Sequence, residues 1–133
     1  MKIILMFLVF TGFSISGINA QEKLWFDANG NITSQEKAVY YRVFSTNKTE
    51  KQLVVDYYIS GKKAKESYFV KGKPNGKYLE FYLTGEVRVV GSFKDGFREG
   101  MWKVYDKNGK IKEKGKYEQG EKVGVWKTFY KNN

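Results

Sequence analysis

Hydrophobic and polar residues alternate along the C-terminal half of the chain. In the stretch from Glu86 to Lys94, one face would carry Val87, Val89, Gly91 and Phe93. In the stretch from 110 to 117, one face would carry Lys110, Lys112, Lys114 and Lys116, and the other Ile111, Gly115 and Tyr117. A period of two is typical of a β-strand. Both stretches therefore predict strands that are apolar on one face only.

These strands recur with a fixed spacing. Gly76, Gly100 and Gly124 stand 24 residues apart and begin equivalent units. Aromatic residues recur at the same step in three columns: Tyr78, Trp102 and Trp126; Phe81, Tyr105 and Phe129; Phe69, Phe93 and Tyr117. A period of this length indicates a repeat architecture, in which each unit buries its apolar face only against its neighbours.

Glycine-containing segments separate the strands and define the fold. We expect tight turns at Ser60–Lys62, Thr84–Glu86 and Asn108–Lys110, where glycine permits a positive φ. We expect longer loops closed by glycine at 73–76, 97–100 and 121–124. The predicted fold class is all-β, a meandering antiparallel sheet of β-hairpin repeats over residues 61–133. Residues 21–60, with strands at 37–44 and 52–59, are less regular and are typical of a cap.

Glycines inside strands suggest how the aromatic columns pack. Gly91 and Gly115 interrupt predicted strands, where glycine usually marks a bend or a large ring lying over the backbone. We therefore expect Trp102 or Trp126 to cover one of them. The alternative is that exposed rings form a platform on which sugars or bases stack.

The first 20 residues form a separate segment. Lys2 precedes an apolar run from Ile3 to Phe10, and an aliphatic-x-Ala sequence ends at Ala20. This layout is typical of a cleaved signal peptide, for which we expect a helix. An uncleaved anchor is the alternative, but the apolar run is shorter than the ~20 residues of a spanning helix. The chain is expected to be exported, as a periplasmic, outer-membrane-associated or secreted protein.

The composition excludes several kinds of catalytic and metal site. The chain has 24 Lys and Arg against 14 Asp and Glu, and neither His nor Cys. It therefore lacks the residues for histidine acid–base catalysis, thiol nucleophiles, disulfides and ordinary zinc sites. Asp56 and Glu80 share a column, but its next member is Val104, and no nucleophile–base pair is visible. We predict a non-enzymatic protein with no catalytic, cofactor or metal site.

The repeated unit resembles a known family. Residues 100–109 read Gly-Met-Trp-Lys-Val-Tyr-Asp-Lys-Asn-Gly, and 115–126 continue as Gly-Lys-Tyr-Glu-Gln-Gly-Glu-Lys-Val-Gly-Val-Trp. This pattern resembles the MORN repeat in its bacterial form, closely from Gly61 to Tyr130 and loosely from Leu24 to Ser60. Such repeats occur in membrane-associated scaffolds, lipid-kinase regulatory regions and secreted bacterial proteins. One bacterial group carries the label of toxin–antitoxin antitoxin component.

Candidate binding residues come from the charged and aromatic columns. They are Lys110, Lys112, Lys114, Lys116, Trp102, Trp126 and Tyr130, with Lys71, Lys94, Lys103 and Lys127 nearby in the pattern. The first hypothesis is an exported module that binds an unidentified protein partner across the sheet face or edge. The alternatives are an electrostatic binder of anionic lipid or glycan, and an antitoxin or immunity-type protein acting against an envelope toxin.

Two further partner classes follow from the same residues. The basic stripe coincides with an export signal, which argues against nucleic acid as the partner. The last strand, from Val125 to Tyr130, would leave an open edge protected mainly by Lys127 and Lys131. Such an edge accepts a partner strand, so pairing with another protein or homodimerisation is a further route to binding.

Overall fold

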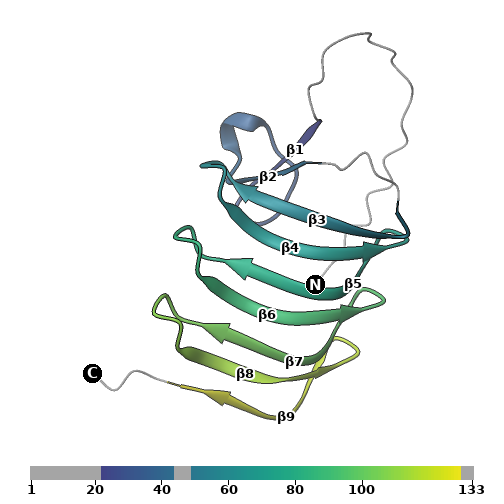
Figure 1. Cartoon of the computed structure of the whole chain (residues 1–133), viewed down its shortest axis with the longest axis vertical. Coiled ribbons are helices and arrows are strands. Elements are labelled where there is room, and N and C mark those ends of the chain that lie inside the picture. Colours follow the sequence, from purple (N-terminus) through teal and green to yellow (C-terminus); the bar gives the residue numbers. More distant parts are fainter. Residues whose placement is uncertain (1–21, 44–48, 130–133) are drawn as a thin grey trace.

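The computed structural model describes residues 22–43 and 49–129. Nine strands form one antiparallel sheet in the order of the sequence (Figure 1). They are β1 (Lys23–Phe26), β2 (Tyr40–Val43), β3 (Lys51–Tyr58), β4 (Lys63–Val70), β5 (Lys73–Phe81), β6 (Val87–Lys94), β7 (Phe97–Tyr105), β8 (Ile111–Glu118) and β9 (Glu121–Thr128). A short 3-10 helix, η1 (Gln35–Lys37), links β1 to β2. The all-β meander is confirmed, whereas the expected signal peptide and Tyr130 lie outside the described residues.

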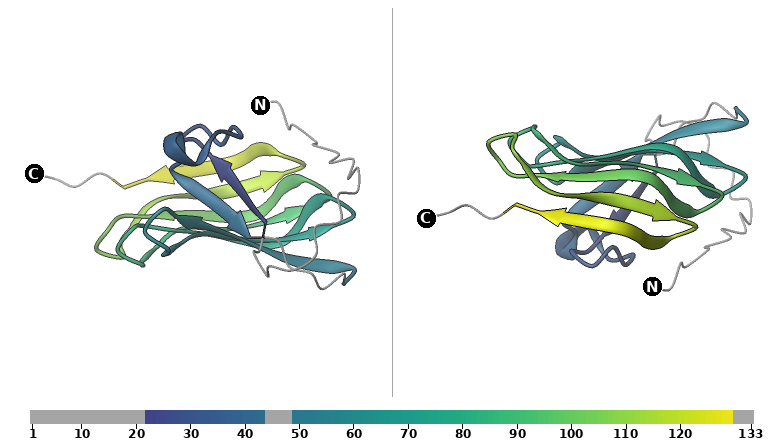
Figure 2. Two further views of the ribbon diagram at one scale, coloured as in Figure 1. Left: turned by 90° about the horizontal axis from the view of Figure 1, so that it is seen from above. Right: turned by 90° about the horizontal axis from the view of Figure 1, so that it is seen from below.

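The sheet is a single twisted layer (Figure 2). Each strand packs against the strands before and after it in the chain, and no described element forms a second layer over either face. The core is correspondingly thin, because the hydrophobic residues with buried side chains in the described part of the chain are Ala64, Trp102 and Tyr117. No helix in this part is long and apolar enough to cross a membrane.

The two kinds of turn are the reverse of the expected ones. The connections predicted as longer loops are two-residue turns, Lys71-Gly72, Asp95-Gly96 and Gln119-Gly120, in which both residues have positive φ. Such turns match the right-handed twist of the flanking strands. The other connections are the longer ones: at residues 82–86 and 106–110 the first residue donates its N–H to the carbonyl of the last, and glycine takes the left-handed position.

The residues at 73–76, 97–100 and 121–124 are therefore not loops but lie inside β5, β7 and β9. Gly76, Gly100 and Gly124 have φ of 115°, 73° and 65°, each next to a shift in strand register. A left-handed glycine at a register shift is typical of a β-bulge. The glycines spaced 24 residues apart consequently mark bulges that bend every second strand.

Both tryptophans cover glycines, as expected from the sequence. A Cβ added to Gly91 would lie 2.2 Å from the Trp102 ring, and one added to Gly115 would lie 2.2 Å from the Trp126 ring. The rings of Tyr78, Phe93, Trp102, Tyr117 and Trp126 follow one another at centroid distances of 4.9–5.8 Å. This aromatic ladder joins β5 to β9 and packs one face of that part of the sheet.

Hydrogen bonds between equivalent positions tie successive repeats together. The Tyr58 hydroxyl donates to the Phe81 carbonyl, and the Tyr82 hydroxyl donates to the Tyr105 carbonyl, at 2.6 and 2.7 Å. At the opposite end of the strands, the N–H of Gly96 donates to the Pro74 carbonyl and that of Gly120 to the Arg98 carbonyl. The same bonds therefore recur with the repeat and fix the spacing of the hairpins.

Candidate interaction surface

The sheet has two chemically different faces. Successive residues of a strand point to opposite sides, so Trp102 and Lys103 mark the two faces on β7. We call the side of Trp102 the aromatic face, because it carries the aromatic ladder. The opposite side is the lysine face, which carries Lys103, Lys114, Lys127, Lys116, Met101 and Val125.

Basic side chains cover the rings of the aromatic face. The Arg98 guanidinium lies 4.7 Å from the Trp102 ring centroid and 5.3 Å from that of Tyr117, and it donates to the Tyr117 hydroxyl at 2.9 Å. The Lys122 ammonium lies 4.2 Å from the Trp126 ring centroid, and the Trp126 Nε1 donates to the Lys116 carbonyl. Because Trp102 is only 3% exposed, its ring packs the sheet and leaves no open stacking platform at that position.

The carboxylates of the aromatic face are held in ion pairs. Asp56 accepts two hydrogen bonds from the Arg42 guanidinium, at 2.6 and 3.0 Å. Glu80 accepts hydrogen bonds from the Tyr78 hydroxyl and from Arg88. Burial, with the charge of Glu80 as the second cause, raises the pKa of Tyr78 above its ordinary value. The two carboxylates that share a column are thus engaged with arginines and bridge strands.

Three lysines stand side by side on the lysine face. Lys103 on β7 lies directly opposite Lys114 on β8, which in turn lies opposite Lys127 on β9. None of the three forms an ion pair with a carboxylate among the described residues. Like charges directly opposite one another on adjacent strands are destabilising. We call these residues the lysine row.

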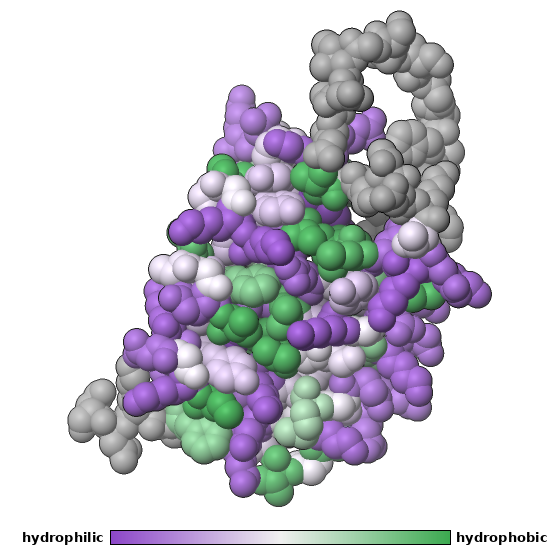
Figure 3. All heavy atoms as spheres, in the orientation of Figure 1, coloured by the Kyte–Doolittle hydropathy of each residue, from purple (hydrophilic) through white to green (hydrophobic). Residues whose placement is uncertain are grey.

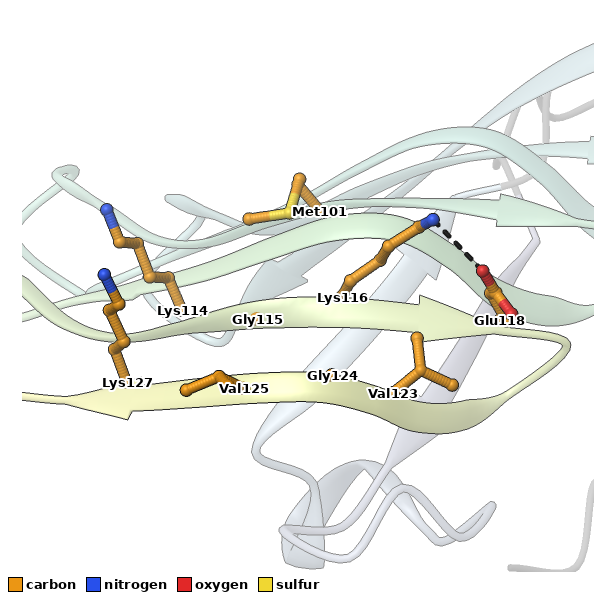
Figure 4. Close-up of a pocket in the computed structure, with 9 residues that line it drawn as sticks. All are labelled: Met101, Lys114, Gly115, Lys116, Glu118, Val123, Gly124, Val125 and Lys127. Atoms are coloured by element: carbon orange, nitrogen blue, oxygen red, sulfur yellow. Dashed lines mark hydrogen bonds and ion pairs between the residues drawn. The ribbon is translucent and has the colours of Figure 1, made fainter.

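The lysine row borders an open hollow (Figure 4). Lys114 and Lys127 project in parallel on one side of it, and Lys116 turns on the other side toward Glu118, to which it donates at 3.1 Å. Met101, Val123 and Val125 supply its apolar lining. Met101 is 54% exposed and Val125 is 81% exposed. The hollow therefore combines uncompensated positive charge with solvent-exposed apolar side chains.

The expected stripe of four lysines is only partly formed. Lys110 precedes β8 and belongs to the turn. A register shift then leaves Lys112 with no opposite residue on β7, because Val104 pairs with Glu113 and Tyr105 with Ile111. Only Lys114 and Lys116 keep the strict alternation. The bulge divides the predicted stripe, and cross-strand pairing brings Lys103 and Lys127 beside Lys114 instead.

Apolar and hydrophilic side chains are interspersed across the surface in the view of Figure 3, where green patches over the later strands are separated by purple side chains.

Met101, Val123 and Val125 were not among the candidates chosen from the sequence. The alternation of the strands could have identified them. Each lies an odd number of positions from a ring of the aromatic face in the same strand, and therefore on the opposite face.

The comparison with known families agrees with this geometry. Residues 74–95 and 98–119, which hold the β5–β6 and β7–β8 hairpins, match the family model described as MORN repeat variant. These two hairpins are therefore MORN repeats of the variant type. This assignment is consistent with a non-enzymatic repeat module. No curated protein and no solved structure matches the chain.

Proposed function

We propose that the chain is an exported, non-enzymatic interaction module that docks a protein partner on its lysine face. The observation that supports this proposal is the lysine row beside the exposed apolar side chains of Met101 and Val125. The partner that fits such a surface has an acidic patch next to apolar residues. Export rests on the signal-peptide pattern of residues 1–20.

Electrostatics favours an anionic partner over a neutral one. The positions of Lys103, Lys114 and Lys127 place three like charges on neighbouring strands, which are about 4.8 Å apart. Carboxylates brought by a partner would offset this repulsion. Because Met101 and Val125 are exposed beside the lysine row, the same contact would bury apolar area and add an energy that salt does not screen.

The lysine row also favours a second candidate, a binder of anionic lipid or glycan. In this case charge would hold the ligand on the lysine face. The exposed apolar residues would add little binding energy for a glycan. An immunity-type function against an envelope toxin is a special case of the protein-docking proposal, in which the toxin is the partner.

Capture experiments across a salt gradient separate these candidates. The full chain would be immobilised and exposed to an envelope extract of its own source, and in parallel to vesicles containing anionic lipid. A protein retained at high salt and released by Met101→Ser with Val125→Ser supports docking. Binding to vesicles or glycan that falls steeply with salt and survives those two changes supports the second candidate.

A further inference from the structure

The repeats pair their strands through one recurring tripeptide. Gly76-Lys77-Tyr78 on β5 runs antiparallel to Gly91-Ser92-Phe93 on β6, so Gly76 lies opposite Phe93 and Tyr78 lies opposite Gly91. Each aromatic residue therefore faces a glycine across the ladder. Gly91 leaves room for the Trp102 ring because it has no Cβ, whereas Gly76 supplies a positive φ of 115°.

The next hairpin repeats this arrangement. Gly100-Met101-Trp102 on β7 pairs with Gly115-Lys116-Tyr117 on β8, so Gly100 lies opposite Tyr117 and Trp102 opposite Gly115. In both hairpins a glycine-x-aromatic tripeptide is paired with another of the same form. The middle residues of the two tripeptides also lie opposite each other on the lysine face.

The outer edge of a third such tripeptide has no partner among the described strands. Gly124-Val125-Trp126 lies on β9, whose outer edge pairs with no described strand. Val125 is 81% exposed, and Trp126 is more exposed than the buried Trp102. The opposite edge of the sheet is partly closed, since Thr33 donates its N–H to the Trp25 carbonyl and Ile32 bridges Phe26.

We propose that β9 pairs antiparallel with β9 of a second copy of this chain, with Val125 opposite Val125. In this register Gly124 lies opposite Trp126 of the second copy and Trp126 lies opposite its Gly124. The tripeptide read in the reverse direction again places a glycine opposite an aromatic residue, as in the two pairings inside the sheet. A slip of one or more positions removes this match.

The remaining contacts of this register are compatible with pairing. Lys127 lies opposite Val123 of the second copy, so no lysine faces a lysine across the new ladder. The two-fold axis runs perpendicular to the sheet and keeps the two lysine faces on one side. Self-association therefore goes beyond the docking of a foreign partner, and it would place two lysine rows on one continuous surface.

Single-cysteine variants of the full chain test both the dimer and its register. The chain contains no cysteine, so Val125→Cys introduces one thiol per copy. Residues directly opposite in a ladder have Cα atoms about 5 Å apart, within the span of a disulfide. In Lys127→Cys, the matched control, the two thiols would lie about 13 Å apart along the strands, too far for a disulfide.

The expected result is a doubled mass for the wild-type chain in sedimentation at high protein concentration, and rapid crosslinking of Val125→Cys but not of Lys127→Cys under mild oxidation. Val125→Lys should give a monomer with an unchanged circular dichroism spectrum, because the site is exposed and only the second copy is disturbed. A monomer at every concentration, or equal crosslinking of both cysteine variants, would overturn the proposal.

Discussion

At the scale of single residues, the fit between tryptophan and glycine decides the stability of the sheet. The Trp102 ring contacts the Gly91 backbone closely enough that an added methyl would lie 2.2 Å from it. Trp102 is held on both sides by Phe93 and Tyr117, whereas Trp126 has a ring neighbour only in Tyr117 among the described residues. The site of Trp102 and Gly91 should therefore tolerate added volume less well than the site of Trp126 and Gly115.

We expect Gly91→Ala to lower the free energy of unfolding by about 1–3 kcal/mol, the usual cost of forcing extra volume into a packed site. Gly115→Ala should cost less, because Trp126 is more exposed than Trp102 and has fewer ring neighbours. Urea unfolding of both variants checks this order, with Ser92→Ala as a control on the opposite face. Equal stability of all three would contradict the packing described here.

The buried phenol of Tyr78 predicts a loss of stability in alkali. Burial raises the pKa of Tyr78 above its unfolded value of about 10. The folded protein therefore holds this proton more tightly, so the contribution to stability is present below about pH 10 and is lost as the pH rises further.

In Tyr78→Phe this alkaline loss should be smaller than in the wild-type chain, although the variant is less stable near pH 7 because Glu80 loses a hydrogen bond. Urea unfolding at neutral and alkaline pH measures the difference. The pKa of Tyr58 is also raised by burial, so the comparison with wild type is essential. Parallel pH profiles for the two proteins would be inconsistent with a buried phenol at this position.

At the scale of elements, the turns carry backbone strain. Lys71 and Gln119 have φ of 50° and 48°, in the left-handed region that favours glycine and asparagine. The backbone N–H of Gln119 donates to the Glu99 carboxylate. That bond is independent of the Gln119 side chain.

Gln119→Asn should raise the free energy of unfolding by about 0.5–1 kcal/mol, because asparagine tolerates positive φ in a two-residue hairpin turn. Gln119→Ala is the matched control and should bring no gain, since alanine has the same backbone preference against this conformation. Thermal unfolding measures both. A gain with alanine as large as that with asparagine would indicate a cause other than the turn.

The strands were predictable from the sequence, but the bulges were not. Alternation and the 24-residue period placed the hairpins, and the glycines within strands placed the tryptophans. The same pattern did not distinguish a turn glycine from a bulge glycine, because both take positive φ. Gly100 was therefore assigned to a loop although it lies inside β7. The bulge near Lys112 then changed which lysines share a face.

At the scale of the whole molecule, the sheet is a thin repeat structure whose ladder fills one face and leaves the other available. The positive charge and the period were evident from the sequence. The lysine row was not, because it depends on the register of three strands, which sequence alternation alone does not supply. The position of Met101 and Val125 beside the lysine row follows from the same register.

The most direct test of the lysine face compares two variants with equal charge loss. In one, Lys103, Lys114 and Lys127 are changed to glutamine; in the other, the exposed Lys37, Lys62 and Lys71 are changed instead. Binding of each to the captured partner would be measured at one ionic strength. Our account predicts that the first variant loses binding while the second keeps it. Equal weakening in both would show that net charge, and not the lysine row, governs recognition.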